Sequence, residues 1–558
     1  MMPPVVIVGA GPVGLTAALL LARRQVPCLV LERHPKPYPL PRAVHLDGEV
    51  VRILQQAGVA EHFAEVSRPM PGLRLVDGRL RTLAEFHRGN PVGASGHPEA
   101  SMFDQPDLEA LLNQAAADSP LITIQRAAEV TGLTHRAGGA LVRYRQHGHD
   151  HAVHAPAVLG CDGAGSTIRT ALDIEWRDLG FTEPWLVIDV RSPKPLPVWE
   201  GVHQVCDPRR AATFMHLLGD RYRWEFRILP GDRVQDLTSP AGLARLLAPW
   251  LEDVDFEDLR ILRSATYTFQ ARIARSWRER RVLLLGDAAH QTPPFIGQGL
   301  GSGLRDAANL AWKLDLVLRG AADETLLDSY QAEREPHTLA MIHGAKLVGW
   351  ALTGGNGHTA GVRRSLVRQM CRIPGISRAV LRADSPPLRL ALRRARRSPV
   401  GRLIPQPRPE SDGDWFDDLL GDGFALVTLD PVDPGTAPCR VVHVDDDSPA
   451  GHWLSGAGIR AALVRPTAPS APSPGSAARC REHCRIPKGT GHDRLAGRPR
   501  PLRHRPLSHP VHSRRARPPR RHAWAARLER TGRPGPHGRH RRAGRGAVHL
   551  LARRALRR

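Results

Sequence analysis

The sequence has little cysteine and few long runs without charge. Its seven cysteines are scattered along 558 residues and are odd in number. That pattern argues against a disulfide framework and favours a reducing, cytoplasmic location. The length leaves room for two to four domains, and a hydrophobic content of 41% supports a folded core.

Acidic residues and aromatic side chains are nearly missing from residues 466–558. This tail has 25 Lys and Arg against 3 Asp and Glu, a balance of +22, and it has no Phe, Tyr or Met. The rest of the chain has 54 basic and 52 acidic residues, a balance of +2. The tail therefore cannot build a core, and we predict that it is disordered. Nucleic-acid binding is not expected of the nearly neutral remainder.

Two interpretations of the tail stay open. One is a basic arm for nucleic acid or a membrane surface. The other, which we favour, is a displaced reading frame, because Arg, Pro, Ala, Gly and His are what a GC-rich gene gives out of frame. The change is abrupt after "IRAALVRP", and a restored frame should give an apolar strand after Pro466. Cys480, His483 and Cys484 in this tail are attributed to chance, and no metal site is predicted.

One long uncharged run near the N-terminus includes Val5–Ala22. Its length permits a membrane span. Three glycines and a proline interrupt it, however, and no basic residue precedes it, so neither a span nor a secretory signal is expected. Instead "VVIV" predicts a buried strand, "GAGPVG" a tight turn, "LTAALLLARR" a helix and "CLVLE" a second strand.

The turn of this βαβ unit has the spacing of a dinucleotide-binding site. Gly9 allows the sharp turn, Gly11 lets a pyrophosphate approach the backbone, and Gly14 lets the helix pack closely on the sheet. The phosphates would lie on free N–H groups at the start of the helix. Glu32 ends the second strand, where a carboxylate can accept hydrogen bonds from a ribose.

Two later stretches of the sequence help to decide whether the cofactor is permanently bound or dissociates after each reaction. In "APAVLGCDGAGSTIRTAL" (155–172) a strand ends at Asp162-Gly163 and a helix begins near Ser166, although a simple capped turn would look the same. In "RRVLLLGDAAHQTPPFIGQGLGSGLRDAANLAWKL" (280–314) a strand ends at Asp287, which is placed to bind polyol hydroxyls.

The glycine-rich loop after Asp287 has few protruding side chains, so a flat ring system could lie against its backbone. A long helix follows, capped by Ser302 or a neighbour, and its positive end would point at the ring. A resident flavin needs a site for adenosine, one for the ribityl chain and one for the ring. A mobile nicotinamide needs only the first, so the strand at 5–8 is predicted to hold FAD.

These three stretches resemble the fingerprints of the class A flavoprotein monooxygenases. The resemblance extends to about Pro466 and is strongest to the 3-(3-hydroxyphenyl)propionate hydroxylases and their relatives. The further stretches that carry it are "PRAVHLDGEVVRIL" (41–54), "FDQPDLEALL" (103–112), "DLGFTEPWLVIDV" (178–190), "VCDPRR" (205–210), "RWEFRILPGD" (223–232) and "LLDSYQAEREPHTLAMI" (326–342).

The resemblance implies a set of FAD contacts and a loop, Pro293–Gly301, that lines the ring. Within that loop Pro293, Gly299 and Gly301 are the expected catalytic positions. Relatives often have Asn at the position of Gly301, so a side-chain contact to the ring would be lost while backbone N–H groups remain. The expected FAD contacts are Gly9, Gly11, Gly14, Glu32, Arg33, Arg42, Gln105, Asp162, Gly163, Gly286, Asp287 and Gly297.

The resemblance also implies a reaction. NADH or NADPH, docking transiently, reduces the flavin; O2 then gives a flavin hydroperoxide that passes one oxygen to an electron-rich aromatic ring. Arg42 and Arg169 are candidate contacts for the hydride donor. The segment 174–275 is predicted to be a sheet that keeps water from the ring. Its candidate substrate neighbours are His216, Arg223, Trp224 and Tyr267, although strand surface or core is the commoner role for any one of them.

A base near the substrate would help, because a phenol reacts faster once its oxygen loses the proton, but the sequence does not identify one. The predicted function is hydroxylation of a phenolic or aromatic acid substrate, with O2 and NAD(P)H as co-substrates. Alternatives are a tailoring oxygenase for an aromatic polyketide or antibiotic, a flavin reductase or oxidase, and, from another class, a basic nucleic-acid-binding protein.

We therefore predict an α/β fold with several parts. A Rossmann-like FAD-binding domain begins at 1–173 and is completed, with further helices, by 276–372. The β-sheet substrate domain is inserted at 174–275. After a linker at 373–410, three predicted strands at 411–465 indicate an incomplete thioredoxin-like domain, in which Cys439 has no CxxC partner. The disordered tail at 466–558 follows.

Overall fold

The computed structural model describes residues 2–37, 43–88, 92–207, 209–353, 386–388, 400–407, 414–432 and 439–466. Arg42, most of the predicted linker and all of the predicted tail after Pro466 lie outside these residues. Among the described helices, none combines the length and the apolar character that crossing a membrane requires. The uncharged run at Val5–Ala22 is instead a strand, a turn and most of a helix, as predicted.

A six-stranded sheet forms the centre of the FAD-binding part, in the order β18-β19-β12-β1-β2-β8. Its inner strands are short and apolar, and β1, β12 and β19 are fully buried, as a parallel sheet covered on both faces requires. All neighbouring pairs are parallel except β18 with β19. The strands are β1 (Val5–Val8), β2 (Cys28–Glu32), β8 (Ile122–Arg126), β12 (Val158–Gly160), β18 (Arg278–Glu279) and β19 (Val282–Leu284).

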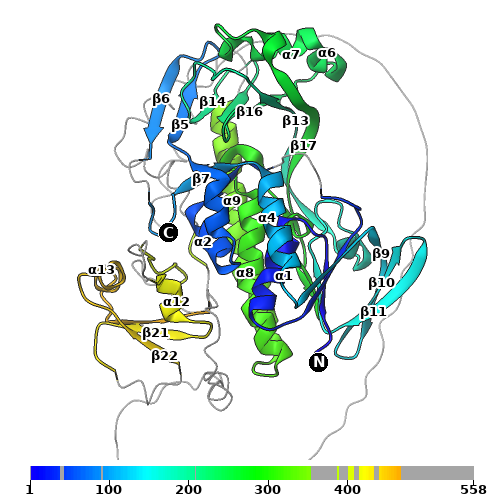
Figure 1. The fold of residues 1–558 in the computed structure, drawn as a ribbon, viewed down its shortest axis with the longest axis vertical. Helices are drawn as coiled ribbons and strands as arrows, with labels where there is room; N and C mark the ends of the chain where they lie inside the picture. The colour runs from blue at the N-terminus through cyan, green and yellow to red at the C-terminus, as the bar shows by residue number, and fades with distance from the viewer. Residues whose placement is uncertain are drawn as a thin grey trace, which may run out of the picture. The chain divides into compact units, whose positions relative to one another are not determined.

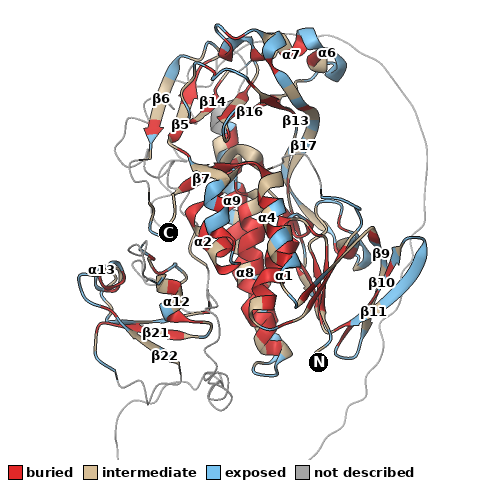
Figure 2. Cartoon of the chain, viewed as in Figure 1, coloured by how far each residue is buried: buried red, intermediate tan, exposed pale blue. Residues whose placement is uncertain are grey.

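Helices pack beside this sheet, and α1, α4, α8 and α9 lie together in the middle of the molecule (Figure 1). α8 is buried along most of its length (Figure 2). It begins at Gly299 after Gln298, one turn earlier than the predicted cap at Ser302. The helices here are α1 (Pro12–Arg23), α2 (Gly48–Gln56), α3 (Ala60–Glu65), α4 (Gln105–Ala117), α5 (Thr167–Ala171), α8 (Gly299–Leu318) and α9 (Asp328–Thr353), with short 3-10 turns η3 (Gly286–Ala288), η4 (Pro294–Ile296) and η5 (Glu324–Leu327).

The predicted substrate sheet exists, but it draws strands from beyond 174–275. Eight strands pair in the order β20-β17-β13-β16-β15-β14-β5-β6, and β5 and β6 come from the first part of the chain. Parallel pairing of β14 with β5 joins the two segments. The strands are β5 (Gly72–Val76), β6 (Thr82–His87), β13 (Trp176–Arg191), β14 (Val202–Val205), β15 (Ala212–His216), β16 (Arg221–Arg227), β17 (Arg260–Ala274) and β20 (His290–Gln291).

One face of this sheet has its own apolar core. Phe214, Trp224 and Trp250 are buried there with Leu243 and Leu247 of α7. In Figure 1, α6 and α7 lie beyond this face, on the side away from α8 and α9. The helical pieces are α6 (Val234–Thr238), α7 (Pro240–Leu247), η1 (Ala248–Trp250) and η2 (Phe256–Asp258).

Two small sheets were not foreseen from the sequence. One orders its strands β3-β7-β4 and connects the two large parts; the other is the antiparallel meander β11-β10-β9. Their strands are β3 (His45–Asp47), β4 (Ser67–Pro69), β7 (Ala100–Phe103), β9 (Ala128–Arg136), β10 (Gly139–Gln146) and β11 (His149–Ala155).

The three strands predicted in 411–465 also form a sheet, in the order β22-β21-β23. Val427 and Leu454 are central to its separate core. Arg52 of α2 binds Asp417 of this part, and both side chains are buried. The elements are α12 (Phe416–Leu420), β21 (Ala425–Thr428), β22 (Arg440–His443), α13 (Pro449–Gly456) and β23 (Ala461–Val464). The thioredoxin-like assignment of this part stays a prediction.

Candidate active site

The predicted cofactor motifs meet at one edge of the parallel sheet. β19, β12, β1 and β2 are adjacent and parallel, so their carboxyl ends lie side by side. The glycine turn follows β1, Glu32 ends β2, Asp162 follows β12 and Asp287 follows β19. Ligands of open α/β sheets bind at this edge. Residues up to 278 positions apart, Gly9 and Asp287, are thereby brought to one edge of the sheet.

The glycine turn is tightly packed at two positions and open at the third. Gly9 has φ +104°, and a Cβ there would lie 2.5 Å from the carbonyl oxygen of Cys161. A Cβ on Gly14 would lie 2.1 Å from the carbonyl oxygen of Gly9. A Cβ on Gly11 would meet nothing within 4 Å. At Gly9 and Gly14, close packing leaves no room for a side chain. Gly11 faces open space that a pyrophosphate could fill.

Glu32 holds this turn in place. Its carboxylate accepts hydrogen bonds from the backbone N–H of Ala10 at 2.8 Å and from that of His34 at 2.8 Å. A carboxylate has about four acceptor positions, so capacity for ribose hydroxyls remains. Arg33 is exposed and contacts the ring of His34.

Gln105 begins α4 and is buried. Its side-chain oxygen accepts a hydrogen bond from the N–H of Ala43 at 2.7 Å, and its amide donates to Glu109 at 2.6 Å. It thereby fixes the backbone at Ala43.

Asp162 binds the start of the short helix α5, whose N-cap is Ser166. One carboxylate oxygen accepts from the hydroxyl of Ser166 at 2.6 Å, and the other accepts from the N–H of Ile168 at 3.1 Å. Burial raises the pKa of Asp162, and these hydrogen bonds act against that shift. Gly163 next to it has φ +78° and no atoms near its Cβ position, which leaves the backbone open to a ligand.

The side chain of Arg169 of α5 packs on the ring of Trp176. Its guanidinium lies 4.8 Å from the centre of that ring, and it donates to the carbonyl of Ile174 at 2.5 Å. Arg169, the residue predicted to contact the hydride donor, is therefore engaged in local contacts.

The GD turn ends β19 with an exposed acid. Asp287 is exposed at the carboxyl end of the strand, while Gly286 is buried at φ +59°. A Cβ on Gly286 would lie 3.1 Å from the side chain of Val13, so α1 and this turn are in contact. The expected polyol contact thus faces outward on the same edge as Glu32.

The loop Pro293–Gly301 runs from a buried proline into the start of α8. Gly297 has φ +62° and lies against the ring of His45. Burial lowers the pKa of His45 to about 4, so this ring is neutral at pH 7. A Cβ on Gly299 would meet nothing within 4 Å, and the first N–H groups of the 20-residue helix have no intrahelical acceptor.

Gly301 has less room than Gly299. A Cβ there would lie 3.0 Å from Arg305 and 3.1 Å from Val50. Arg305 is held by Asp47 at 2.7 Å and by Glu49 at 2.8 Å. Burial opposes its charge, but these two carboxylates outweigh burial and raise its pKa. The space that a side chain at 301 would enter is therefore bordered by a fixed guanidinium.

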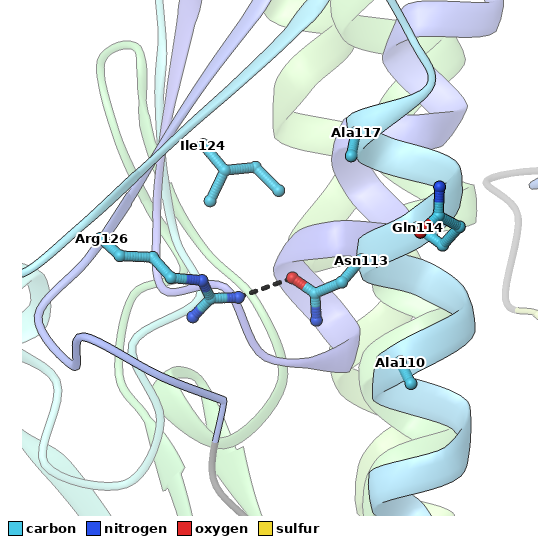
Figure 3. A pocket seen from close by; sticks show the side chains of 6 residues that line it. All are labelled: Ala110, Asn113, Gln114, Ala117, Ile124 and Arg126. Carbon is cyan, nitrogen blue, oxygen red and sulfur yellow. Dashed lines mark hydrogen bonds between the residues drawn. The ribbon is translucent and has the colours of Figure 1, made fainter.

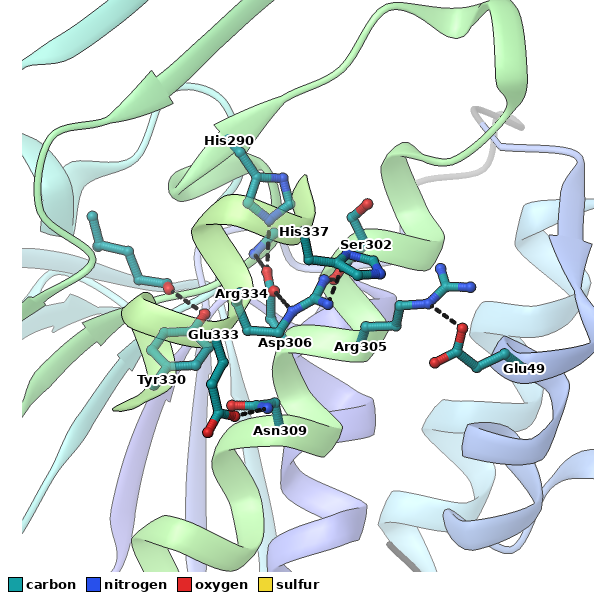
Figure 4. A network of polar contacts seen from close by, with 12 residues as sticks. Glu49, His290, Ser302, Arg305, Asp306, Asn309, Tyr330, Glu333, Arg334 and His337 are labelled. Carbon is teal, nitrogen blue, oxygen red and sulfur yellow. Dashed lines mark hydrogen bonds and ion pairs between the residues drawn. The ribbon is translucent and has the colours of Figure 1, made fainter. Parts of the chain in front are cut away.

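Sequence reasoning missed the buried network behind this loop (Figure 4). Asp306 of α8 accepts from the N–H of Gly286 at 3.1 Å, from His290 at 2.7 Å and from Arg334 of α9 at 2.8 Å. Arg334 also donates to the carbonyl of Ser302 at 3.2 Å. Charged residues inside "GLRDAANL" were the only sequence signal. The network ties the GD turn to both central helices.

The site has polar groups that protein atoms leave unpaired. Across the described residues, five such buried atoms lie on this loop and its flanks: His290 Nδ1, Gln291 Nε2, Thr292 Oγ1, Gln298 Nε2 and Ser302 Oγ. A buried polar group without a hydrogen bond costs about 1–3 kcal/mol. Together with the open backbone at Gly11 and Gly299, these atoms fit a polar ligand with a flat ring at the loop and phosphates at the glycine turn, which is the shape of FAD.

The predicted substrate neighbours separate onto two faces of the large sheet. Trp224 is fully buried in the core beneath α7, and His216 stacks on Tyr222 of that same face at 4.7 Å between ring centres. Arg223 is fully buried on the opposite face, and Tyr267 is half-buried there. The alternation in "RYRWEFR" already predicts that Arg223 and Trp224 point to opposite faces of the sheet. It does not predict which of the two faces looks toward the flavin.

A surface pocket of about 500 Å³ lies elsewhere, between α4 and the edge strand β8 (Figure 3). It is lined by Ala110, Ala117 and Ile124, with Arg126 donating to Asn113 at 2.6 Å. None of its lining residues belongs to the cofactor motifs.

The comparisons agree with this geometry. Residues 2–345 match a family model described as "FAD binding domain". The chain belongs to the FAD-dependent aromatic hydroxylases. FAD is the resident cofactor of this monooxygenase family, and a nicotinamide supplies the electrons.

Among curated hydroxylases, the chain is 39% identical over 335 residues to a probable NADH-specific resorcinol 4-hydroxylase of Rhodococcus jostii. That match spans 60% of this chain and 62% of the relative, less than two thirds of its length. It is 35% identical over 435 residues to a 3-(3-hydroxy-phenyl)propionate/3-hydroxycinnamic acid hydroxylase of Mycolicibacterium smegmatis, covering 76% of each chain.

Solved structures of hydroxylases share the fold. Aklavinone-11 hydroxylase, solved with FAD and aklavinone, has a TM-score of 0.67 at 23% identity and covers 86% of this chain and 98% of its own. The anhydrotetracycline hydroxylase OxyS of Streptomyces rimosus has a TM-score of 0.67 at 26% identity, covering 84% and 94%.

Proposed function

We propose that this hydroxylase acts on a small phenol with one aromatic ring. The observation that carries the proposal is a strip of half-buried residues on the face of the large sheet that looks toward the ring loop. Thr213, Glu225, Ala265 and Tyr267 form it; they come from β15, β16 and β17, and β13 lies between β16 and β17. Hydroxyl and carboxylate groups beside a small residue suit a polar ring better than an extended apolar one.

The bound flavin would supply hydride acceptance and oxygen activation. The chain's own part is to hold it and exclude water. Phe295 of the ring loop packs on Trp185 and Phe181 of β13, at 5.8 and 5.7 Å between ring centres. These contacts close one side of the space between loop and sheet, and a closed space protects a reactive oxygen species from water.

Two of the relatives have names that specify phenols, resorcinol in one and 3-hydroxyphenylpropionate or 3-hydroxycinnamate in the other. These names support a hydroxyl-bearing single ring, with or without a carboxylate side chain. The alternative is a tailoring oxygenase for a polycyclic aromatic, and it has the support of similar structures at lower identity.

The test is a substrate panel on the FAD-loaded protein with NADH and NADPH in turn. It should contain resorcinol, 3-hydroxyphenylpropionate, 3-hydroxycinnamate and one anthracyclinone. We expect a single-ring phenol to accelerate NAD(P)H loss and to appear as a product heavier by one oxygen, labelled from ¹⁸O2. NAD(P)H loss without product for every compound would contradict hydroxylation and favour the oxidase alternative. Product from the polycycle alone would favour the tailoring oxygenase.

A further inference from the structure

The two faces of β16 have opposite chemistry. Tyr222, Trp224 and Phe226 point into the apolar core beneath α7. Because side chains alternate along a strand, Arg223 and Glu225 point to the other face. β16 is paired on both sides, with β13 and with β15, so it is an interior strand.

That other face covers the FAD-binding part. Met215, the cross-strand partner of Arg223, packs with Val44 and Met102 of the small connecting sheet. On the same face, Arg221 binds Asp104 and Asp107 at the start of α4, beside Gln105. Together with the contact between Trp185 and Phe295, these contacts place the middle of this face between α4 and the ring loop.

Glu225 lies on that face and is not fully covered. Its cross-strand partners are Thr213 and Val187, and Val187 pairs in turn with Ala265. Glu225, Thr213 and Ala265 are each half-buried. In an interior strand the sheet shields the flanks, so this exposure comes from a gap over the face. The gap is the strip that we assign to the substrate.

The charges around Glu225 belong to three strands. Asp189 of β13 binds Arg223 at 2.6 Å and lies 3.7 Å from Arg263 of β17. Within the described part of the chain, the Glu225 carboxylate takes part in no hydrogen bond or ion pair, and both arginines act on it only through space. Burial raises the pKa of Glu225; Arg223 and Arg263 act against burial, and Asp189 adds to it.

We propose that Glu225 is the general base of the reaction and accepts the phenol proton of the substrate. The O–H bond of the phenol breaks, the proton passes to a carboxylate oxygen of Glu225, and the electron pair stays on the phenolate oxygen. No oxidant or reductant is needed for this step. Arg223 and Arg263, fixed by Asp189, offset the phenolate charge as positioning residues. This inference rests on the proposed phenolic substrate.

The direct test uses 4-nitrophenol as a coloured probe that binds without turnover of NAD(P)H. With the wild-type holoenzyme, we expect the bound probe to show its phenolate band at pH values below its own pKa, because Glu225 takes the proton. E225Q should bind the probe as the neutral phenol. E85Q is the matched control: Glu85 lies in the same sheet on β6 and is already bound to Arg74 at 2.8 Å. E85Q should behave as wild type.

The rate of product formation provides an independent test of the proposal. General base catalysis contributes about 10²–10⁴-fold, so E225Q should lose that factor in product formation near neutral pH and recover as the free substrate ionises at higher pH. E225D should restore part of the rate. A uniform loss at all pH values, or a phenolate band in E225Q equal to wild type, would overturn the role as base. If wild type makes no product from any phenol, the proposed function fails, and the probe still decides the role of Glu225.

Discussion

The substitution Asp306→Asn tests whether the buried network supports the flavin site. Asp306 is fully buried and accepts from Arg334 with one oxygen and from Gly286 N–H and His290 with the other. Asn has one acceptor oxygen and two N–H donors. Whichever way the amide is turned, its NH2 group faces a donor. Arg334, whose side chain is 2% exposed, would then lose its only described carboxylate partner.

The expected loss is large. Breaking a buried pair by removing one partner costs about 3–5 kcal/mol. For a domain of about 150–250 residues, each kcal/mol lowers the melting temperature by about 2–4 °C. A shift of roughly 6–20 °C is therefore expected. Because Gly286 loses its acceptor next to Asp287, flavin should also dissociate at lower temperature.

Thermal unfolding followed by circular dichroism, together with flavin fluorescence on release, measures both effects. The control is Asp150→Asn, since Asp150 pairs with Arg145 at the surface and is 73% exposed. It should leave both temperatures unchanged. Equal melting temperatures for Asp306→Asn and Asp150→Asn would refute the reasoning.

The same variant makes a pH prediction. Burial alone would raise the pKa of Asp306, but His290 and Arg334 outweigh burial and lower it. A carboxyl group with a depressed folded-state pKa contributes stability above its unfolded pKa of about 3.9 and loses it as pH falls through the folded value. The difference between wild type and Asp306→Asn should thus stay constant between about pH 8 and pH 5 and shrink only below about pH 4. A difference that grows on acidification would contradict this account.

Four further substitutions test the site and its supports. Gly14→Ala should lower both melting temperature and flavin content, because its Cβ would lie 2.1 Å from a carbonyl oxygen, whereas Gly11→Ala should keep the fold and lose FAD affinity. Glu32→Gln should weaken FAD binding about 10- to 100-fold, measured by reconstituting the apoprotein, since hydrogen bonds to a charged group are worth about 1.5–3 kcal/mol; unchanged affinity would remove Glu32 from the site. Arg465→Ala should lower the free energy of unfolding in urea by about 1.5–3 kcal/mol. The reason is that Arg465 binds Glu333 through both terminal nitrogens, at 3.0 and 2.9 Å. A variant as stable as wild type would show that this contact does not stabilise the fold.

Much of the cofactor site could be predicted because its signals are local. Gly9 and Gly14 are required by the turn itself, and Glu32, Asp162 and Asp287 follow short apolar strands whose ends any parallel sheet brings together. The strands of the substrate sheet and of the part around Val427 were predicted from the same short patterns. The start of α8 was misplaced by one turn because Gly299 and Gly301 weaken the helical signal.

The sequence by itself determined the βαβ unit, the aspartates at strand ends and the unusual composition of the tail, since each depends on residues that are close in the chain. Only the tertiary structure decided that β5 and β6 join the substrate sheet, that Asp306 meets His290 and Arg334, and that Glu225 rather than Trp224 looks toward the ring loop. The physical reason is that these outcomes depend on which distant segment covers a given face. Alternation along a strand gives two faces, and only packing against the rest of the chain makes one of them the inside of a site.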